Sequence, residues 1–334
     1  MEITIYGAGA IGGLTGAFLA KAGQDVLLVD MVAEHVEAMN RQGLKVTGFS
    51  NFTVPVRACL PGELQGQLGL TFLAVKAMNT EDALEVLEPL VGPETVVVSF
   101  QNGMNEPKIA ARIGADRTIG AFINFGADWQ GPGHVEHGGQ GAIYLGELDG
   151  RITDRLRRLQ TLLSTMQTVH VTDNLFGYLW SKITWASALF AQAVTNETTS
   201  DVMGNKRYQR LMIALCGEGV AVAQATGIKI EAFDAYEPLK MRPRTDEEMA
   251  AAVAVLDRIS ERNKGRVKAR SGIWRDLAVR HRSTEVDSQV GFLISEGEKL
   301  GIDTPLLKRL MTQIKEIERG ERQQGLDNLE ELLV

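Results

Sequence analysis

The stretch MEITIYGAGAIGGLTGAFLAKAGQDVLLVD, residues 1–30, decides the fold of this chain. An apolar strand is expected at 3–6, a helix from about Ala10, and a second apolar strand at 26–29. Between the first strand and the helix lies the glycine turn 7–12, which has the spacing G-x-G-x-x-G. A strand, this turn and a helix in succession are typical of a dinucleotide-binding unit.

Each glycine of the turn has its own expected part in binding a dinucleotide. Gly7 permits the tight turn, Gly9 lets the backbone approach a pyrophosphate, and Gly12 lets the helix pack closely on the strand. The pyrophosphate is expected at the helix N-terminus around Ala10 and Ile11, where unpaired N–H groups and the helix dipole attract an anion. The alternative is an ordinary glycine turn with a purely structural role.

Asp30 is placed to distinguish the two nicotinamide dinucleotides. An acid about 20 residues after the glycines can accept hydrogen bonds from the adenosine ribose 2′-OH, and its charge repels the 2′-phosphate of NADP. We therefore expect NAD(H) to be favoured, with NADP(H) possible because Arg41 or Lys45 could pair with a phosphate. The alternative is that Asp30 follows the strand by chance.

Composition and charge restrict the class of protein. The chain has 334 residues, of which 44% are hydrophobic, and a net charge of −7. These values suit two globular domains and argue against non-specific nucleic-acid binding. Cys59 and Cys216 stand far apart, so neither a disulfide framework nor a zinc cluster is indicated. With no signal peptide and no apolar run of bilayer length, we expect a cytoplasmic protein without a membrane or nucleic-acid partner.

The two halves of the chain differ in their pattern of elements. Strands and helices alternate up to residue 171, as in a parallel sheet with crossover helices, and helices alone are expected after it. The sequence therefore predicts an α/β protein. Its N-terminal Rossmann domain, 1–171, has a mostly parallel sheet, and its C-terminal domain, 172–334, is all-α.

Polar residues follow two predicted strands of the first half. Buried strands are expected at 70–75 and 95–100, and Lys76 and Asn102 come after them. Because ligands collect at the carboxyl ends of parallel strands, Lys76, Asn102 and the glycine turn should face one crevice. Taken singly, an exposed loop lysine and a turn asparagine are sufficient explanations.

The glycine-rich segment 131–146 is expected to form an antiparallel hairpin at the edge of the sheet. It carries His134 and His137, whose H-x-x-H spacing could hold a metal ion. No acid or cysteine stands nearby at ligand spacing. We therefore expect solvent-exposed loop histidines and no metal site.

Lys182 lies in the apolar stripe of a helix expected at 174–194. At about 100° per residue it shares a face with Tyr178 and Ala186, which is an unfavourable place for an ammonium group. Such a lysine needs a partner or loses its proton more readily, and so can become a general acid or base. The alternatives are a lysine whose stem covers apolar surface, or one half of a structural ion pair.

Glu285 is a second candidate for chemistry in the helical half. It follows Thr284, an expected N-cap, so that a first-turn acid interacting with the helix dipole is a sufficient explanation.

Six motifs stand in order along the chain: GAGAIGG at 7–13, AVKA at 74–77, QNGM at 101–104, GPGHVEHGGQGAIYLGE at 131–147, WSK at 180–182 and TEVD at 284–287. Together they resemble the ketopantoate reductases (2-dehydropantoate 2-reductases), and the similarity runs nearly end to end. The resemblance implies a role in pantothenate biosynthesis, with Gly7, Gly9 and Gly12 holding the dinucleotide. It also implies that Lys76 and Asn102 line the cofactor and substrate crevice, that Lys182 is the general acid and that Glu285 hydrogen-bonds the substrate.

The chain departs from the family pattern at the expected substrate contacts. The family usually has asparagines one and two helical turns after the lysine, where this chain has Ala186 and Phe190. The serine that commonly binds the substrate carboxylate aligns near Ser271-Gly272, and a basic residue for the NADP phosphate is replaced by Asp30-Met31. These changes suggest a related but different 2-oxo acid.

The sequence thus predicts NAD(P)H-dependent reduction of a small 2-oxo acid to a 2-hydroxy acid, with Lys182 as general acid and Glu285 orienting it or the substrate. Two alternatives stay open: a dehydrogenase of another hydroxy acid or an opine-like compound, and a non-catalytic NAD(H)-binding sensor. Retention of both Lys182 and Glu285 argues against the sensor. By fold analogy, the helical half could support a homodimer.

Overall fold

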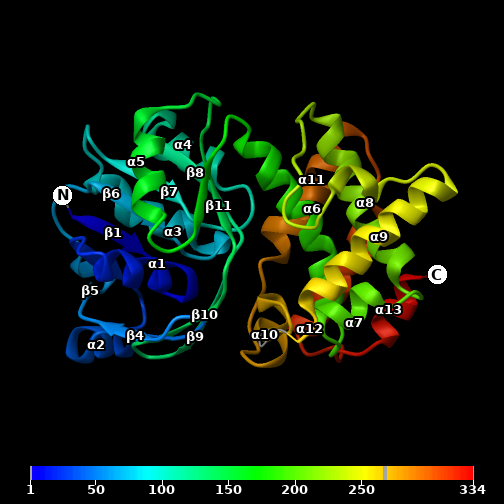
Figure 1. Ribbon diagram of the computed structural model, residues 1–334, viewed down its shortest axis with the longest axis horizontal. Coiled ribbons are helices and arrows are strands. Elements are labelled where there is room, and N and C mark those ends of the chain that lie inside the picture. Colours follow the sequence, from blue (N-terminus) through cyan, green and yellow to red (C-terminus); the bar gives the residue numbers. More distant parts are fainter. Residues whose placement is uncertain (1, 266–268, 334) are drawn as a thin grey trace. The chain divides into compact units, whose positions relative to one another are not determined.

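The computed structural model describes residues 2–265 and 269–333, and the chain forms two compact units, Met1–Leu175 (unit 1) and Phe176–Val334 (unit 2). Figure 1 shows strands with helices around them in unit 1 and helices in unit 2. The predicted fold class, an α/β unit followed by a helical one, is confirmed. Among the described residues, no helix has the length and apolar character that crossing a bilayer requires.

The main sheet of unit 1 has the strand order β12-β11-β8-β7-β6-β1-β2-β5 among the described residues. Every neighbouring pair in it is parallel except β8 with β11. The chain leaves β1 first toward β2 and later returns to its other side at β6, so the strand order reverses at β1. The strands are β1 (Ile3–Tyr6), β2 (Val26–Val29), β5 (Arg57–Cys59), β6 (Leu70–Leu73), β7 (Val96–Ser99), β8 (Thr118–Ile123), β11 (Ala142–Glu147) and β12 (Thr168–Val171).

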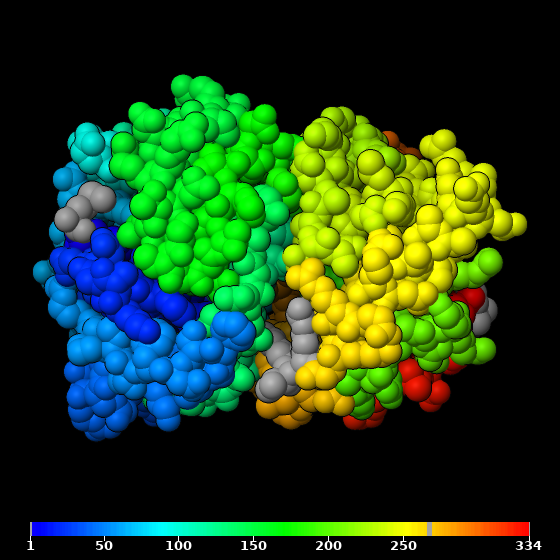
Figure 2. All heavy atoms as spheres, in the orientation of Figure 1, coloured from blue at the N-terminus to red at the C-terminus, as the bar shows by residue number. Residues whose placement is uncertain are grey.

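Helices cover both faces of this sheet. Alternate residues of a strand point to opposite faces, so Ile5 joins the core with Leu14 of α1 and Leu156 of α5, while Tyr6 joins a second core with Leu84 of α3. The surface of unit 1 that is green in Figure 2 includes α5. The helices of unit 1 are α1 (Ala10–Lys21), α2 (Ala33–Gln42), α3 (Thr80–Leu87), α4 (Glu106–Ile113) and α5 (Asp154–Leu163).

A second, four-stranded sheet among the described residues has the order β4-β3-β10-β9 and packs on α1. A Cβ on Gly13 of α1 would lie 3.1 Å from Val135 Cγ1, and the ring centroids of Phe18 and Phe52 are 5.2 Å apart. Its strands are β3 (Leu44–Gly48), β4 (Phe52–Val54), β9 (Gly126–Gly131) and β10 (His134–Gly139).

The predicted hairpin at 131–146 is wrong. The antiparallel hairpin is β9–β10, in the second sheet, and β11 belongs to the main sheet beside β8. The chain changes sheet at Gly141, where a Cβ would lie 1.6 Å from Asn124 O. The glycines that suggested a turn therefore permit a close crossing of two chain segments.

Unit 2 is built around α6, most of whose residues are buried. A Cβ on Gly219 of α8 would lie 3.3 Å from Thr184 Cγ2 of α6 and 2.9 Å from Leu293 Cδ1 of α11, so these three helices pack closely. The helices are α6 (Leu175–Ala193), α7 (Thr199–Gly204), α8 (Gln209–Ala225), α9 (Asp246–Asn263), α10 (Gly272–Ala278), α11 (Val286–Leu300), α12 (Pro305–Glu318) and α13 (Asp327–Leu332).

Candidate active site

The three glycines of the turn have three different environments. Gly7 has φ +98°, and a Cβ there would lie 2.7 Å from Val75 N. A Cβ on Gly12 would lie 2.0 Å from Gly7 O, so the helix can approach the strand only without a side chain. At Gly9, by contrast, no atom of the described residues beyond its own chain neighbours lies within 4 Å of the Cβ position. A group that approaches the turn would therefore meet bare backbone at Gly9.

The first turn of α1 carries unused hydrogen-bond donors. Its first backbone bond runs from Gly13 N to Gly9 O at 2.8 Å, and its N-cap, Gly9, offers no side chain. Among the described residues, the N–H groups of Gly9, Ala10, Ile11 and Gly12 make no hydrogen bond, and the first turn has no acidic residue. These donors and the helix dipole suit an anion.

Asp30 follows β2 and is half-buried. Its Oδ1 accepts a hydrogen bond from Val32 N at 3.0 Å, while Oδ2 has no hydrogen bond within the described residues. Arg41, a possible phosphate partner, pairs with Glu37 at 3.6 Å near the end of α2. At 1.5 Å per residue this is about 12 Å along the helix from its first residue. The carboxylate is therefore the nearer of the two charges to the end of β2.

The carboxyl ends of the central strands are level with the glycine turn. Tyr6 pairs with Val29 and Leu73, and Leu73 pairs with Ser99, so Gly7, Asp30, Ala74 and Phe100 follow in one row. Lys76 is half-buried and Asn102 exposed in the two loops beyond this row.

Two side-chain amides that the sequence reasoning missed join these loops. Gln101 is buried, and its Nε2 donates to Val75 O at 3.1 Å and to Thr80 Oγ1 at 2.8 Å. Asn105 Nδ2 donates to Asn102 O at 2.7 Å. An amide directly after a strand and another before a helix were the available signals, because both residue types commonly satisfy loop backbone groups.

Lys182 is half-buried on α6, between Ser181 and Ile183, which are both buried. Two residues further along, Thr184 Oγ1 lies 2.9 Å from the hydroxyl of Tyr236, itself only 2% exposed. The helix that presents Lys182 is therefore fixed by the core of unit 2.

Glu285 is the N-cap of α11, and its side chain does not cap that helix. Thr284 Oγ1 accepts from Val286 N at 3.2 Å, and the same hydroxyl donates to Glu318 Oε1 at 2.7 Å. α11 thus begins at Val286, so Glu285 precedes the first turn in which the sequence placed it.

The helices that carry Lys182 and Glu285 pack against each other. The ring centroids of Trp180 on α6 and Phe292 on α11 are 5.2 Å apart.

Ser271 is the N-cap of α10, and its Oγ accepts from Trp274 N at 3.2 Å. Its backbone N donates to Gln192 Oε1 at 3.4 Å. Gln192 lies ten residues after Lys182 on α6, which is about 15 Å along the helix axis. Gly272 is exposed beside Ser271. A helix cap explains the Ser271 hydroxyl, and the described bonds join Ser271 to the C-terminal part of α6.

Two family models match this chain: Ketopantoate reductase PanE/ApbA over residues 3–150, and Ketopantoate reductase PanE/ApbA C terminal over residues 174–318. The chain belongs to the ketopantoate reductase family. The resemblance based on six motifs is confirmed, and this family member is an NAD(P)-dependent oxidoreductase that acts on CH–OH groups.

Relatives and solved structures match this chain over nearly its whole length. The 2-dehydropantoate 2-reductase of Archaeoglobus fulgidus is 29% identical, over 96% of this chain and 98% of that protein. That of Pyrococcus horikoshii is 29% identical, over 94% and 97%. The fold is similar to that of a PanE/ApbA family ketopantoate reductase from Ralstonia eutropha JMP134, with TM-score 0.80, 27% identity and 96% and 99% of the two chains covered. It is also similar to D-mandelate dehydrogenase with NADH and anilino(oxo)acetate, with TM-score 0.84, 22% identity and coverage of 96% and 99%.

The expectation of exposed loop histidines is wrong for this family member. His134 and His137 lie on β10, and because they are three residues apart their side chains point to opposite faces of the strand. His137 is 2% exposed, its Nδ1 lies 3.1 Å from Ser50 Oγ, and its Nε2 lies 3.0 Å from Gln167 Nε2. Within the described residues there is no group of three or more His, Cys, Asp or Glu side chains able to hold a metal ion.

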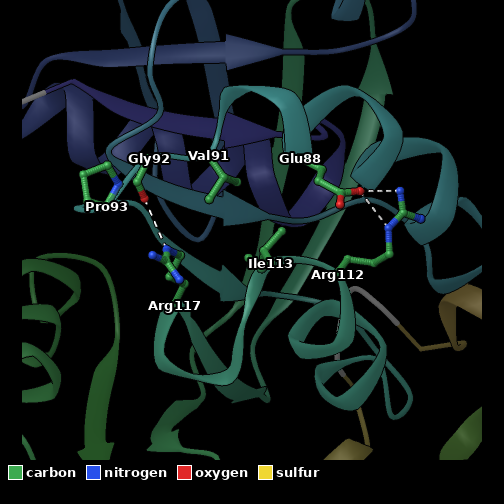
Figure 3. A pocket seen from close by; sticks show the side chains of 7 residues that line it. All are labelled: Glu88, Val91, Gly92, Pro93, Arg112, Ile113 and Arg117. Carbon is green, nitrogen blue, oxygen red and sulfur yellow. Dashed lines mark hydrogen bonds and ion pairs between the residues drawn. The ribbon is translucent and has the colours of Figure 1, made fainter.

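A hollow of about 380 Å³ lies near the amino ends of β7 and β8, whereas the glycine turn follows the carboxyl end of β1 (Figure 3). Its arginines are paired: Arg112 with Glu88 at 2.5 Å, and Arg117 with Asp116 at 3.3 Å. Figure 3 shows the Arg112 pair, and also Arg117 turned toward the carbonyl of Gly92. Because both guanidinium groups already face carboxylates, this hollow does not have the chemistry of an anion site.

Proposed function

We propose that this ketopantoate reductase family member reduces a 2-oxo acid to the 2-hydroxy acid, with NADH preferred to NADPH and with Lys182 as the general acid. One observation carries the proposal. Lysine side chains on helices usually extend into solvent, whereas Lys182 is half-buried on α6, the helix at the centre of unit 2. A charge held in partly apolar surroundings interacts strongly with charge that develops beside it.

The residues of unit 1 fit a dinucleotide. The unused N–H groups at 9–12 would hold the pyrophosphate, and the bare backbone at Gly9 would let it approach. Asp30 would accept hydrogen bonds from the ribose, and its charge favours NADH. Lys76 and Asn102 stand at the same sheet edge as further contacts. When bound, the nicotinamide supplies a hydride to the carbonyl carbon.

Lys182 and Glu285 would carry the proton chemistry. As the carbonyl carbon is reduced, negative charge develops on its oxygen, and Lys182 Nζ donates a proton to that oxygen. The ammonium group also stabilises the charge before the proton moves. Glu285 would accept a hydrogen bond from the substrate hydroxyl or orient the lysine, because its carboxylate is not used as a helix cap.

The substrate differs from 2-dehydropantoate in the group that faces α6. Ala186 and Phe190 are 4% and 0% exposed, and neither can offer a hydrogen bond. We propose a 2-oxo acid whose side group is apolar. Benzoylformate, an aromatic 2-oxo acid, therefore belongs in the substrate panel. Ser271 caps α10 and bonds Gln192, about 15 Å along α6 from Lys182, so neither it nor Gly272 is assigned to the carboxylate beside the reduced carbonyl.

The experiment compares wild type, Lys182→Ala and a matched lysine variant, Lys299→Ala, whose residue is exposed and pairs with Glu296. A panel of 2-dehydropantoate and aliphatic and aromatic 2-oxo acids is followed by NADH absorbance. For the best substrate we expect Lys182→Ala to lower kcat by about 10²–10⁴ and to leave the NADH dissociation constant unchanged. Comparable turnover of Lys182→Ala and wild type would remove the assigned role.

A further inference from the structure

His35 joins the glycine turn to the second sheet. It lies in the first turn of α2 and is 1% exposed. Its Nε2 lies 2.9 Å from Ala8 O, and its Nδ1 accepts from Gly133 N at 2.8 Å. A carbonyl can only accept and an amide N–H can only donate, so the imidazole is the neutral tautomer with its hydrogen on Nε2. One ring thus bonds two backbone segments far apart in the sequence.

The bond to Ala8 O sets the direction of the neighbouring donor. Ala8 and Gly9 share a trans peptide, in which the carbonyl and the N–H point in opposite directions. Because His35 holds the carbonyl, the Gly9 N–H is held pointing away from the imidazole. Ala8 N donates to Val29 O at 3.1 Å, so the residue is fixed on both sides.

Gly13 makes room for this arrangement. A Cβ on Gly13 would lie 2.7 Å from Ala8 O, the acceptor of the His35 bond. A side chain at Gly13 would therefore displace the carbonyl that orients the Gly9 peptide.

The second sheet holds the other side of the imidazole. Gly133 lies in the β9–β10 turn with φ +67°, and its carbonyl accepts from Lys45 N at 2.9 Å. A Cβ there would lie 3.0 Å from Ala38 Cβ on α2, so the turn and the helix are in close contact. The ring of Trp129 meets the imidazole edge-on, with centroids 6.0 Å apart. The imidazole is therefore fixed before any ligand binds.

We propose that His35 is a positioning residue of the dinucleotide site, through which the second sheet orients the Gly9 N–H toward a diphosphate. The inference rests on the proposed cofactor site in unit 1. It gives the second sheet a function, namely to prepare the glycine turn for the anion. If His35 had a purely structural role, replacing it would weaken the binding of ligands with and without phosphate equally.

Two variants separate the two bonds of His35. In His35→Gln the amide reaches as far as Nε2 and can still donate to Ala8 O. In His35→Asn the shorter amide can accept from Gly133 N and does not reach Ala8 O. The matched control is His137→Gln, which alters the other buried histidine of unit 1, whose partners are Ser50 and Gln167. Dissociation constants are measured for NADH, ADP and adenosine, by fluorescence and ligand-observed NMR, with thermal midpoints recorded in parallel.

We expect His35→Asn to weaken NADH and ADP about tenfold, since one oriented hydrogen bond to a charged group is lost, and to leave adenosine unchanged. His35→Gln should stay within about threefold of wild type for all ligands, and so should His137→Gln. The inference is overturned if His35→Asn binds ADP like wild type. An equal loss for ADP and adenosine, or an equal ADP loss in His137→Gln, overturns it too. A wild-type protein that binds neither NADH nor NADPH would instead refute the proposed function, and this inference with it.

Discussion

Asp30 combines a structural bond with a proposed functional one. Its Oδ1 accepts a hydrogen bond from Val32 N at 3.0 Å, just before α2. In the proposed function the carboxylate also accepts hydrogen bonds from the hydroxyl groups of the adenosine ribose. Asp30→Asn keeps an oxygen for Val32 N and removes the charge. We expect the ratio of kcat/KM for NADH to that for NADPH to exceed one in wild type. In the variant the ratio should fall about tenfold or more, because hydrogen bonds to charged groups contribute about 1.5–3 kcal/mol.

The matched control for Asp30→Asn is Asp25→Asn, since Asp25 precedes the same strand and pairs with Arg57 on the surface. Its cofactor ratio should equal that of wild type. A wild-type preference for NADPH would contradict the role given to Asp30.

Single residues were predictable where the backbone itself imposes the requirement. Gly7 and Gly12 could be assigned from spacing, because a positive φ and a close helix–strand approach are local demands. His35 and Gln101 could not, since their partners are backbone groups brought close only by the tertiary fold. His137 was expected to be exposed for the same reason: the glycines around it suggested a loop, and the second sheet that buries it leaves no local pattern.

At the scale of elements, the last turn of α6 depends on the C-terminal segment of the chain. Val194 O accepts from Gly325 N at 3.0 Å and from Asn328 Nδ2 at 2.8 Å. Asn328 is 3% exposed, and its Oδ1 accepts from Arg322 at 2.8 Å. Two of these bonds go to the Val194 carbonyl, one of those that a helix end leaves without a partner inside the helix. The helix that carries Lys182 is thereby anchored at its far end.

We expect Asn328→Ala to lower the free energy of unfolding by about 2–4 kcal/mol, because it loses the buried hydrogen bond to Val194 O and two half-buried ones, to Gln323 O and from Arg322. Urea unfolding followed by circular dichroism measures it. Asn51→Ala is the control, since Asn51 is exposed and bonds only to Gly48 O nearby; it should stay within about 0.5 kcal/mol of wild type. Equal stability of the two variants would contradict the anchoring of α6.

Long helices were predictable and short ones were not. The apolar repeats of α6, α8, α9, α11 and α12 extend over several turns, so that their period is visible in the sequence. α7, α10 and α13 have six or seven residues each, too few to show a period. Two of them start from side-chain caps, Thr198 and Ser271, which in the sequence look like ordinary loop residues.

For the whole molecule, alternation of strands and helices was enough to predict the class. The parallel sheet follows from that order because each crossover helix returns the chain to the end of the sheet at which the previous strand began. The second sheet does not, since β3 pairs with β10 across a separation of 89 residues, Lys45 with His134. Such a pairing depends on the packing of α1 between the two sheets and is absent from any local pattern.

The pH dependence of stability is a property of the whole molecule, and His137 and Glu330 contribute to it in separate ranges of pH. Burial lowers the pKa of His137 below its usual 6.5, so the unfolded chain binds a proton more readily than the folded one. The contribution of His137 is then complete above about pH 6.5 and is lost as the pH falls from there toward the folded pKa. Hydrogen bonds from Arg207 and Tyr208 lower the pKa of Glu330 from 4.5 to about 2, so its contribution is present above pH 4.5 and is lost as the pH falls toward 2.

We therefore expect thermal midpoints to fall between about pH 6.5 and about pH 4.5 chiefly through histidine, and further below that through Glu330. His137→Gln cannot take up a proton, so its midpoint should change less than that of wild type across the upper range and equally in the lower one. Glu330→Gln should show the reverse, a wild-type slope above pH 4.5 and a smaller one below it. An upper-range slope in His137→Gln that equals the wild-type slope would show that protonation of this strand histidine does not limit the stability of the fold.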